Sequence, residues 1–580
     1  MNRTPGSLDR YQRRSGVVLL SISMTVLLGL GGRLAQINVV DRQRLVDYAE
    51  RQQQGEAVLP ARRGMVLDSK GRVVAATEHL PDVYVDPTRI KNVEELAAEL
   101  SPRINIPASR IVERIRSRTA TQYVIIERRV DSITAEAVRA MKNPAVGLTE
   151  HPVRSYPLSE SLSHVLGWVG RDGHGLEGIE LAFDTHLRGK DGHRSTIRDA
   201  RRRALKNAEG EVVAPVDGGH VVLTIDAEIQ RITEDALAES VDHVEAENGL
   251  AIVMSPKTGD ILAMACYPTF DPNNVTVSKP EDRRNRAITD PVEPGSTFKP
   301  VIVSGALDGG FINKTQKFDC MLGTRPMPGR VIKDVTSHGL MDVLGIVTYS
   351  SNVGMSFIAE KMGNPALHAT IRRFHFGEKL GIECPGEADG LVRPLKKWGS
   401  MSTASVAMGY EITVTPLQLA TAFSAIVNEG VMVKPRIVKR LLNADGSVAR
   451  DEAPPRILGQ PVDAETAKFL AREAMVSVVE NSSGRAAQLD HYQVLGKTGT
   501  TKLMSKGAKV YESGAYQGAF VGAAPVGREE LVALVMIRRP NAKIAYYGSA
   551  VAAPVVGKIL GQSLPYVGVL PDPQLASTGP

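Results

Sequence analysis

Three short motifs along the 580-residue chain contain the residue types that acyl transfer through a serine requires. They are Ser296-Thr297-Phe298-Lys299, Ser350-Ser351-Asn352 and Lys497-Thr498-Gly499. Each motif alone also suits an ordinary helix cap, a turn or a solvated lysine. Their coincidence in this order indicates one site that is assembled from three distant segments.

The first motif predicts a nucleophile and its base. A serine hydroxyl needs a neighbouring base at neutral pH. The turn residues Pro294-Gly295 and the apolar run at 301–307 place Ser296 at the start of a buried helix, where the dipole favours negative charge. Lys299, three residues on, is expected to reach Ser296. Burial and a neighbouring cation lower the pKa of a lysine, and Lys497 is the candidate cation.

The other two motifs supply the relay and the substrate contacts. Ser350 is the predicted proton relay to the leaving group, and Asn352 completes its catalytic motif. A strand is predicted at 492–496, just before Lys497-Thr498-Gly499-Thr500. There Gly499 would let a substrate backbone approach as an extra strand, while Lys497, Thr498 and Thr500 would hold a carboxylate. The N–H groups of Ser296 and Thr500 are the predicted oxyanion hole.

Composition bounds the class of protein. The length predicts two or more domains, and contents of 43% hydrophobic and 23% charged residues are ordinary for globular protein. A dispersed net charge of +6 gives no reason to expect nucleic acid. Cys266, Cys320 and Cys384 lack metal-binding spacing, so neither a metal nor a cofactor is predicted. Three unpaired thiols are favoured over a Cys320–Cys384 bridge, and His338 is expected to be structural and not a general base.

The N-terminus predicts a membrane anchor. Residues 16–32 carry no charge, and a helix of about 20 residues spans a bilayer. Arg13 and Arg14 precede this run and orient the N-terminus toward the cytoplasm. A cleaved signal peptide and a buried soluble helix are the alternatives, and the length of the run and the lack of an Ala-x-Ala site disfavour the former. We expect a cytoplasmic tail at 1–15 and a transmembrane helix at 16–37.

The rest of the sequence predicts two further regions. Their boundary lies near residue 216, where the turn-forming residues Asp217-Gly218-Gly219 interrupt the pattern of helices and strands. The first should contain a helix at 41–51, a hairpin at 60–71 and helices at 93–100 and 109–115, with Pro102 and Pro107 in the break between the last two helices. The second should contain strands at 249–254, 260–265, 517–524 and 530–538, and helices from Asp226 to Leu237 and at 550–564. Strands early and late, with helices between, predict an α/β (α+β) sandwich around a central antiparallel sheet.

From about residue 10 to 565 the chain resembles a class B penicillin-binding protein, a peptidoglycan transpeptidase. Asn285 to Asp290, followed by Glu293-Pro294-Gly295-Ser296, resembles the division-specific branch (FtsI type), as does the segment from Gly409 to Gln418. The elongation branch usually has a proline where Glu293 stands and commonly an Asp where Asn352 stands. Glu411 departs from the family, which commonly has Gly there.

The resemblance implies an N-terminal pedestal for dimerisation or docking (38–215), a penicillin-binding transpeptidase domain (216–565) and a disordered tail (566–580). It places Tyr410 at the site. It implies that Ser296 attacks the bond between two D-alanines of a peptidoglycan stem peptide, and that β-lactams acylate the same serine. The implied partners are a membrane glycosyltransferase of the shape-elongation-division-sporulation family and other division proteins, with the catalytic domain outside the cytoplasmic membrane at the septum.

Alternative functions remain open at this point. An elongation-type enzyme would share the chemistry. A β-lactamase or carboxypeptidase would need a deacylating water, and the chain lacks a Glu-x-x-Leu-Asn segment and is longer than a lactamase requires. A membrane-anchored β-lactam sensor or a division scaffold could keep the fold, but a scaffold need not keep all three motifs.

Overall fold

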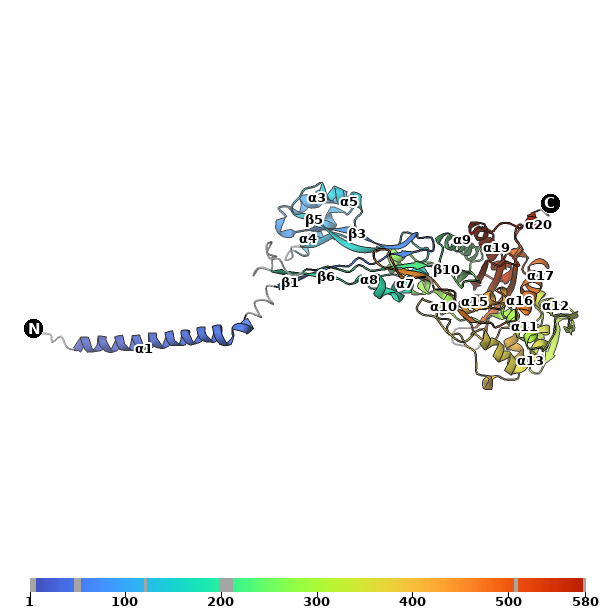
Figure 1. The fold of residues 1–580 in the computed structure, drawn as a ribbon. Helices are drawn as coiled ribbons and strands as arrows, with labels where there is room; N and C mark the ends of the chain where they lie inside the picture. Colours follow the sequence, from blue (N-terminus) through green and yellow to red (C-terminus); the bar gives the residue numbers. More distant parts are fainter. Residues whose placement is uncertain are drawn as a thin grey trace, which may run out of the picture. The chain divides into compact units, whose positions relative to one another are not determined.

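The computed structural model describes residues 7–45, 54–118, 123–197, 212–451, 453–504 and 510–576. The chain divides into two units, and Figure 1 traces its elements. The first unit contains Met1–Ala61 and Gly189–Asp217, and the second contains Arg62–Arg188 and Gly218–Pro580.

The first unit begins with the long apolar helix that the sequence predicts. Helix α1 (Ser7–Ala35) continues into the π turn η1 (Gln36–Val40). Its segment Tyr11–Val40 is 30 residues long and apolar enough to cross a membrane. A three-stranded sheet follows, in which β6 (Gly192–Ile197) pairs with β1 (Gln54–Leu59) and β7 (Val212–Val213). Of the helix predicted at 41–51, residues 42–45 are helical and 46–51 lie outside the described residues.

The second unit opens with the predicted hairpin, formed by β2 (Val66–Leu67) and β3 (Val73–Val85). The Asp68 carboxylate accepts the N–H groups of Lys70 and Arg72 and so fixes the turn. Strand β3 also pairs with β4 (Val124–Glu127) and β5 (Val146–Ser155). Three helices pack around these strands: α3 (Val93–Ile104), α4 (Ala108–Arg116) and α5 (Ser132–Arg139).

Pro102 was expected to lie in the break between the first two of these helices, and this expectation is wrong. It lies inside α3, which ends at Asn105 in the left-handed conformation. Leu100 and Ile104 are buried on the same helix, so packing outweighs the local effect of the proline.

The central sheet is antiparallel throughout, as predicted. Its order is β10-β9-β21-β20-β19. The bounds are β9 (Asn248–Met254), β10 (Ile261–Tyr267), β19 (Leu495–Met504), β20 (Tyr511–Ala524) and β21 (Leu531–Arg538). The strand predicted at 492–496 begins only at Leu495, so the Lys497 motif lies within β19 and not after it.

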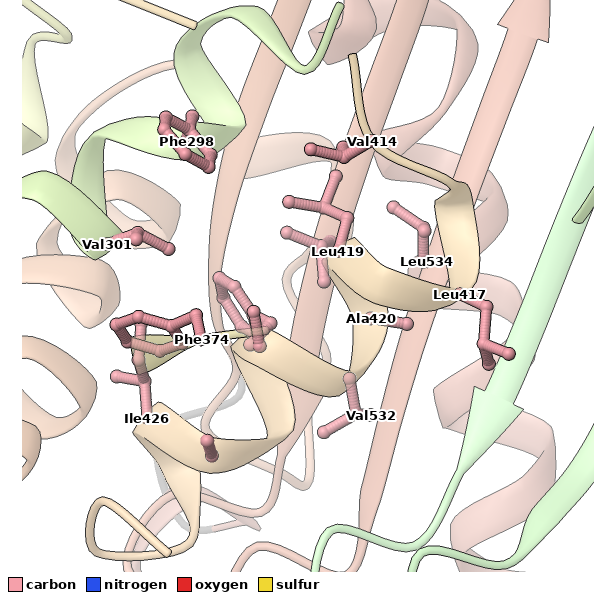
Figure 2. Close-up of a cluster of buried hydrophobic side chains, with 14 of the residues drawn as sticks. Phe298, Val301, Phe374, Val414, Leu417, Leu419, Ala420, Ile426, Val532 and Leu534 are labelled. Atoms are coloured by element: carbon pink, nitrogen blue, oxygen red, sulfur yellow. The ribbon is translucent and has the colours of Figure 1, made fainter. Parts of the chain in front are cut away.

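Helices cover both faces of this sheet. On one face lie α9 (Ala227–His243), capped by Asp226 as predicted but longer, and α19 (Ala553–Tyr566). On the other lies α15 (Pro416–Val427), which is buried along its whole length. The side chains of β21 alternate between the two cores, with Val532 and Leu534 facing α15. Figure 2 shows these two residues in one cluster with Leu417, Leu419 and Phe298.

Most of the other helices occur in the chain segment that connects β10 to β19. They are α10 (Arg286–Thr289), α11 (Lys299–Asp308), α12 (Val343–Thr348), α13 (Asn352–Arg373), α14 (Ser402–Ala407), α16 (Ala464–Phe469) and α17 (Met475–Asn481). The described residues of the same stretch also form eight short strands: β11 (Phe318–Asp319), β12 (Thr324–Met327), β13 (Arg330–Lys333), β14 (Leu340–Met341), β15 (Met432–Val433), β16 (Val438–Leu442), β17 (Val448–Arg450) and β18 (Ile457–Gly459). Shorter elements precede it: α6 (Ser163–Leu166), α7 (Gly178–Ala182), α8 (Asp184–Arg188) and β8 (His220–Leu223).

The C-terminal end differs from its prediction. The single helix expected at 550–564 is two, α18 (Gly548–Val551) and α19, separated at Ala552. In the segment from 566 that was expected to be a disordered tail, the Asp572 N–H donates a hydrogen bond to the His491 carbonyl of the domain. The short helix α20 (Pro573–Ala576) follows. The three cysteines are buried and unpaired, as favoured from the sequence.

Candidate active site

The three motifs meet at one cavity of about 1120 Å³. Seven of the nine predicted site residues line it: Ser296, Ser350, Asn352, Tyr410, Thr498, Gly499 and Thr500. The other two, Lys299 and Lys497, have no exposed surface and lie beneath its wall. The structure therefore brings all nine together.

Ser296 lies in the 3₁₀ turn η5 (Gly295–Phe298), which continues directly into α11. This differs slightly from the predicted α-helical start. The Thr297 hydroxyl donates to the Pro294 carbonyl at 2.6 Å and closes the turn. Phe298 is fully buried, with its ring 5.1 Å from that of Phe376. The turn is thus fixed on both sides of the serine.

Lys299 contacts the middle motif. Its Nζ donates to the Ser350 carbonyl at 2.5 Å, to Ser350 Oγ at 3.2 Å and to Asn352 Oδ1 at 2.8 Å. Within the described part of the chain no hydrogen bond joins it to Ser296 Oγ, although the two residues share one turn. Lys497 Nζ donates to the same Ser350 Oγ at 3.0 Å. The Ser350 hydroxyl is therefore the point at which both lysines converge.

Burial dominates the electrostatics of this pair. It lowers the pKa of Lys299 to about 7, against the opposing attraction of Asp334. It also lowers the pKa of Lys497 well below its ordinary value, and the charge of Lys299 lowers it further. Of the two predicted causes of a lowered Lys299 pKa, burial is therefore the one that acts, and repulsion from Lys497 is not among the causes. Near neutral pH the two lysines therefore carry fewer than two positive charges between them.

Asp334, which was not among the predicted site residues, positions the middle motif. Its carboxylate accepts the Ser351 hydroxyl at 2.6 Å and the N–H groups of Asn352 and Val353 at 2.5 and 3.0 Å. These N–H groups belong to the first turn of α13, where a negative charge is favoured. Asp334 directly follows β13, whose Lys333 carbonyl accepts Asn352 Nδ2 at 2.9 Å. No local sequence pattern marks this residue, because its partners lie 17 to 19 residues further along the chain.

The third motif runs along the free edge of the sheet. Strand β19 is the last strand in the order, and Thr498 and Thr500 face the cavity from it. The Thr498 and Ser483 hydroxyl oxygens lie 2.7 Å apart, and Thr500 Oγ1 accepts the N–H of Gly548 at 3.0 Å. Ser483 also lines the cavity and was not predicted. Lys497 points inward to Ser350, so the two threonines form the polar surface here.

Two glycines let β19 approach the nucleophile turn. A Cβ at Gly499 would lie 2.9 Å from Thr297 Cγ2, and one at Gly295 would lie 2.3 Å from Thr501 Cγ2. Gly295 also has a φ of +55°, which disfavours other residues. The structure thus adds a reason for Gly499 beyond the predicted approach of a substrate: it seats the Ser296 turn against the strand.

His338 lies outside this arrangement. Its ring stacks on that of Tyr349 at a centroid distance of 4.3 Å. Tyr349 lines the cavity, but its neighbour Ser350 takes its contacts from the lysines. Among the described residues no group of three or more His, Cys, Asp or Glu side chains is arranged to hold a metal ion.

The comparisons with known proteins agree with this geometry. Residues 249–561 match the family model of the penicillin-binding protein transpeptidase domain, and residues 58–223 match that of the penicillin-binding protein dimerisation domain. The chain therefore belongs to the penicillin-binding proteins. Because all three motifs lie in the matched transpeptidase domain, the predicted enzyme class, a serine-type transpeptidase, is confirmed.

Individual relatives extend the likeness over the whole chain. The probable peptidoglycan D,D-transpeptidase PbpC of Pseudomonas aeruginosa is 32% identical over 97% of this chain and 97% of its own length. The peptidoglycan D,D-transpeptidase FtsI of Escherichia coli is 30% identical over 97% of this chain and 92% of its own. Among solved structures, penicillin-binding protein 3 of Mycobacterium tuberculosis complexed with aztreonam is 26% identical, with a TM-score of 0.69, over 90% of this chain and 99% of that one.

The glycine contact at β19 generates the first prediction. Gly499→Ala should lower the free energy of unfolding by about 1–3 kcal/mol, because the new methyl group has to displace Thr297. It should also slow covalent labelling by a fluorescent penicillin, since the Ser296 turn moves. Thermal melting and labelling rates measure both effects. Gly399→Ala is the control, since its Cβ would meet nothing within 4 Å. Equal behaviour of the two variants would contradict the packing argument.

Proposed function

We propose that this protein is a peptidoglycan D,D-transpeptidase that cross-links stem peptides during septal wall synthesis and is acylated by β-lactams. The observation that carries the proposal is the cavity in which Ser296 faces an edge strand and a serine held by two buried lysines. The relatives FtsI and PbpC, which are named peptidoglycan D,D-transpeptidases, support the same class of enzyme.

In this proposal the substrate lies extended along β19. A sheet edge offers backbone partners to an added strand. The hydroxyls of Thr498 and Thr500 hold the terminal carboxylate, whose negative charge would favour the protonated form of Lys497 below them. Ser296 Oγ then attacks the carbonyl between the two D-alanines. The N–H groups of Ser296 and Thr500 stabilise the oxyanion.

The proton follows the lysine–serine contacts. Neutral Lys299 takes the proton of Ser296 as the new C–O bond forms. Lys299 then returns this proton to Ser350, and Ser350 donates its own proton to the leaving nitrogen as the C–N bond breaks, while Lys497 orients Ser350. Asn352 fixes Lys299 through its Oδ1. D-Alanine leaves, and an amine of a neighbouring stem peptide attacks the acyl-enzyme by the reverse path.

The division role and the partners form the finer part of the proposal. Glu293 and Asn352 support the division-specific branch over the elongation branch. We assign residues 38–215 to a pedestal and 216–565 to the catalytic domain. The pedestal and the span would dock a membrane glycosyltransferase of the shape-elongation-division-sporulation family and other division proteins. An anchor raises the effective concentration of such partners.

Substitution of the nucleophile tests the central assignment. Ser296→Ala should abolish covalent labelling by fluorescent penicillin while the protein stays folded, because the acylated oxygen is gone. Ser549→Ala is a matched control, since Ser549 lines the same cavity outside the motifs. Labelling of the Ser296 variant at the wild-type stoichiometry would refute the assignment. Rapid turnover of the adduct in the wild type would instead indicate a β-lactamase, and absent labelling a scaffold.

The lysine roles predict a pH profile. Lysine is neutral above its pKa, so the acylation rate constant should rise with pH through about 7. Lys299→Ala should lower that constant by roughly 10²–10⁴-fold with little change in initial binding. Lys497→Ala should mainly weaken initial binding. Stopped-flow acylation separates the two parameters. A wild-type rate that falls as the pH rises through about 7, or the reverse pattern in the two variants, would show the roles to be wrong.

The membrane anchor makes a fourth prediction. Deletion of residues 1–40 should release a soluble protein that still labels with penicillin, because the motifs lie past residue 290. The same deletion should fail to support division. Protease added outside spheroplasts should digest the catalytic domain of the full-length protein, which the positive-inside rule places outside. A protected domain, or a mature N-terminus after residue 30, would overturn the anchored topology.

A further inference from the structure

Glu293, three residues before Ser296, ties three segments together at the cavity wall. Its Oε1 accepts the N–H of Glu411 at 3.0 Å, and its Oε2 accepts the Tyr511 hydroxyl at 3.0 Å. Glu411 and Tyr511 both line the cavity that contains Ser296. One carboxylate thus joins the nucleophile segment to the 410–411 turn and to the start of β20.

The backbone around Glu293 is held in register against the same turn. Val292 and Val414 exchange two hydrogen bonds, both of 2.9 Å. The Gly295 N–H donates to the Gly409 carbonyl at 3.1 Å. Glu293 lies between these two attachments, and its carboxylate extends them to Tyr511. A shift of the 409–414 segment would therefore move the residue directly before Ser296.

Glu411 is an unusual residue for this turn. Its φ of +60° is strained for a side chain with a Cβ. Its carboxylate accepts the Ser402 hydroxyl at 2.8 Å and forms an ion pair with Arg393. These contacts fix the turn, so that the backbone N–H of Glu411 faces Glu293. Strained positions of this kind are maintained where the surroundings over-determine them, which is common at active sites.

We propose that ionised Glu293 is a positioning residue for acyl transfer. It holds the Ser296 turn against the 409–411 turn and ties Tyr511 to the cavity rim. Glu411 supports it by fixing the turn whose N–H Glu293 accepts. The inference rests on the proposed transpeptidase function. Neither glutamate needs to touch the reacting atoms. Their contribution is the geometry of the nucleophile.

The charges around Glu293 make this positioning sensitive to pH. Burial raises the pKa of Glu293 and the negative charge of Glu411 raises it further, against the Glu411 N–H and the Tyr511 hydroxyl. Tyr410 faces the pair from the same turn as Glu411, and Arg393 lies beyond Glu411. Burial and the Glu293 charge raise the pKa of Tyr511, so its hydroxyl stays a donor. Protonation of Glu293 at low pH weakens both contacts.

Acylation kinetics of the full-length protein with fluorescent penicillin test the proposal. Glu293→Ala should lower the acylation rate constant roughly 10- to 100-fold, since small misplacements of reacting groups have effects of this size. The initial dissociation constant should change far less. Glu293→Gln should recover part of the rate, because its Oε1 can still accept the Glu411 N–H. Glu281→Gln, at an exposed position, is the control and should match the wild type.

The pH profile separates positioning from a loss of fold. As the pH falls, the wild-type acylation rate constant should first decrease because Lys299 is protonated. At lower pH this decrease should become steeper, because Glu293 is protonated as well. Glu293→Gln should lack this steepening, and Glu411→Gln should move it to lower pH by removing the neighbouring charge. A Glu293→Ala variant within twofold of wild type, or unchanged steepening in Glu293→Gln, would overturn the inference. If the wild type fails to label at all, the proposed function is rejected and this inference with it.

Discussion

The Ser350 hydroxyl, shared by two buried lysines, is the contact on which the rest of the site depends. Lys299 reaches it from α11 and Lys497 from β19, and both ammonium groups have been removed from water. Two cations around one oxygen without solvent are costly, so the pair gives up a proton near neutral pH. The packing that buries both lysines therefore sets the charge of this pair.

Around that contact, a second layer of residues sets the geometry of the nucleophile. Asp334 fixes the start of α13, Gly499 and Gly295 let β19 close onto the Ser296 turn, and Glu293 attaches that turn to the 409–411 segment. Each of these contacts joins segments that are distant in sequence. The chemistry is therefore carried by a few side chains, while its precision comes from the packing between elements.

The sequence predicts much of this and fails for identifiable reasons. Strands such as β9 and β10 have continuous apolar runs bounded by a clear turn, and α9 has its Asp226 cap, so local signals were sufficient. The prediction that Pro102 lies between two helices is wrong because packing keeps α3 helical through it. The strand predicted from residue 492 begins only at Leu495, because pairing with β20 determines where β19 starts and ends. Asp334 and Ser483 were missed because only the fold brings them to the motifs.

The structure also raises a question that one measurement answers. Ser350 has the two lysines at its hydroxyl, whereas Ser296 only shares a turn with Lys299, so contact distance alone would nominate Ser350 as the nucleophile. Mass spectrometry of peptides from wild-type protein that has reacted with penicillin identifies the modified residue. The account predicts an adduct on Ser296 and none on Ser350. An adduct on Ser350, or on either lysine, would contradict it.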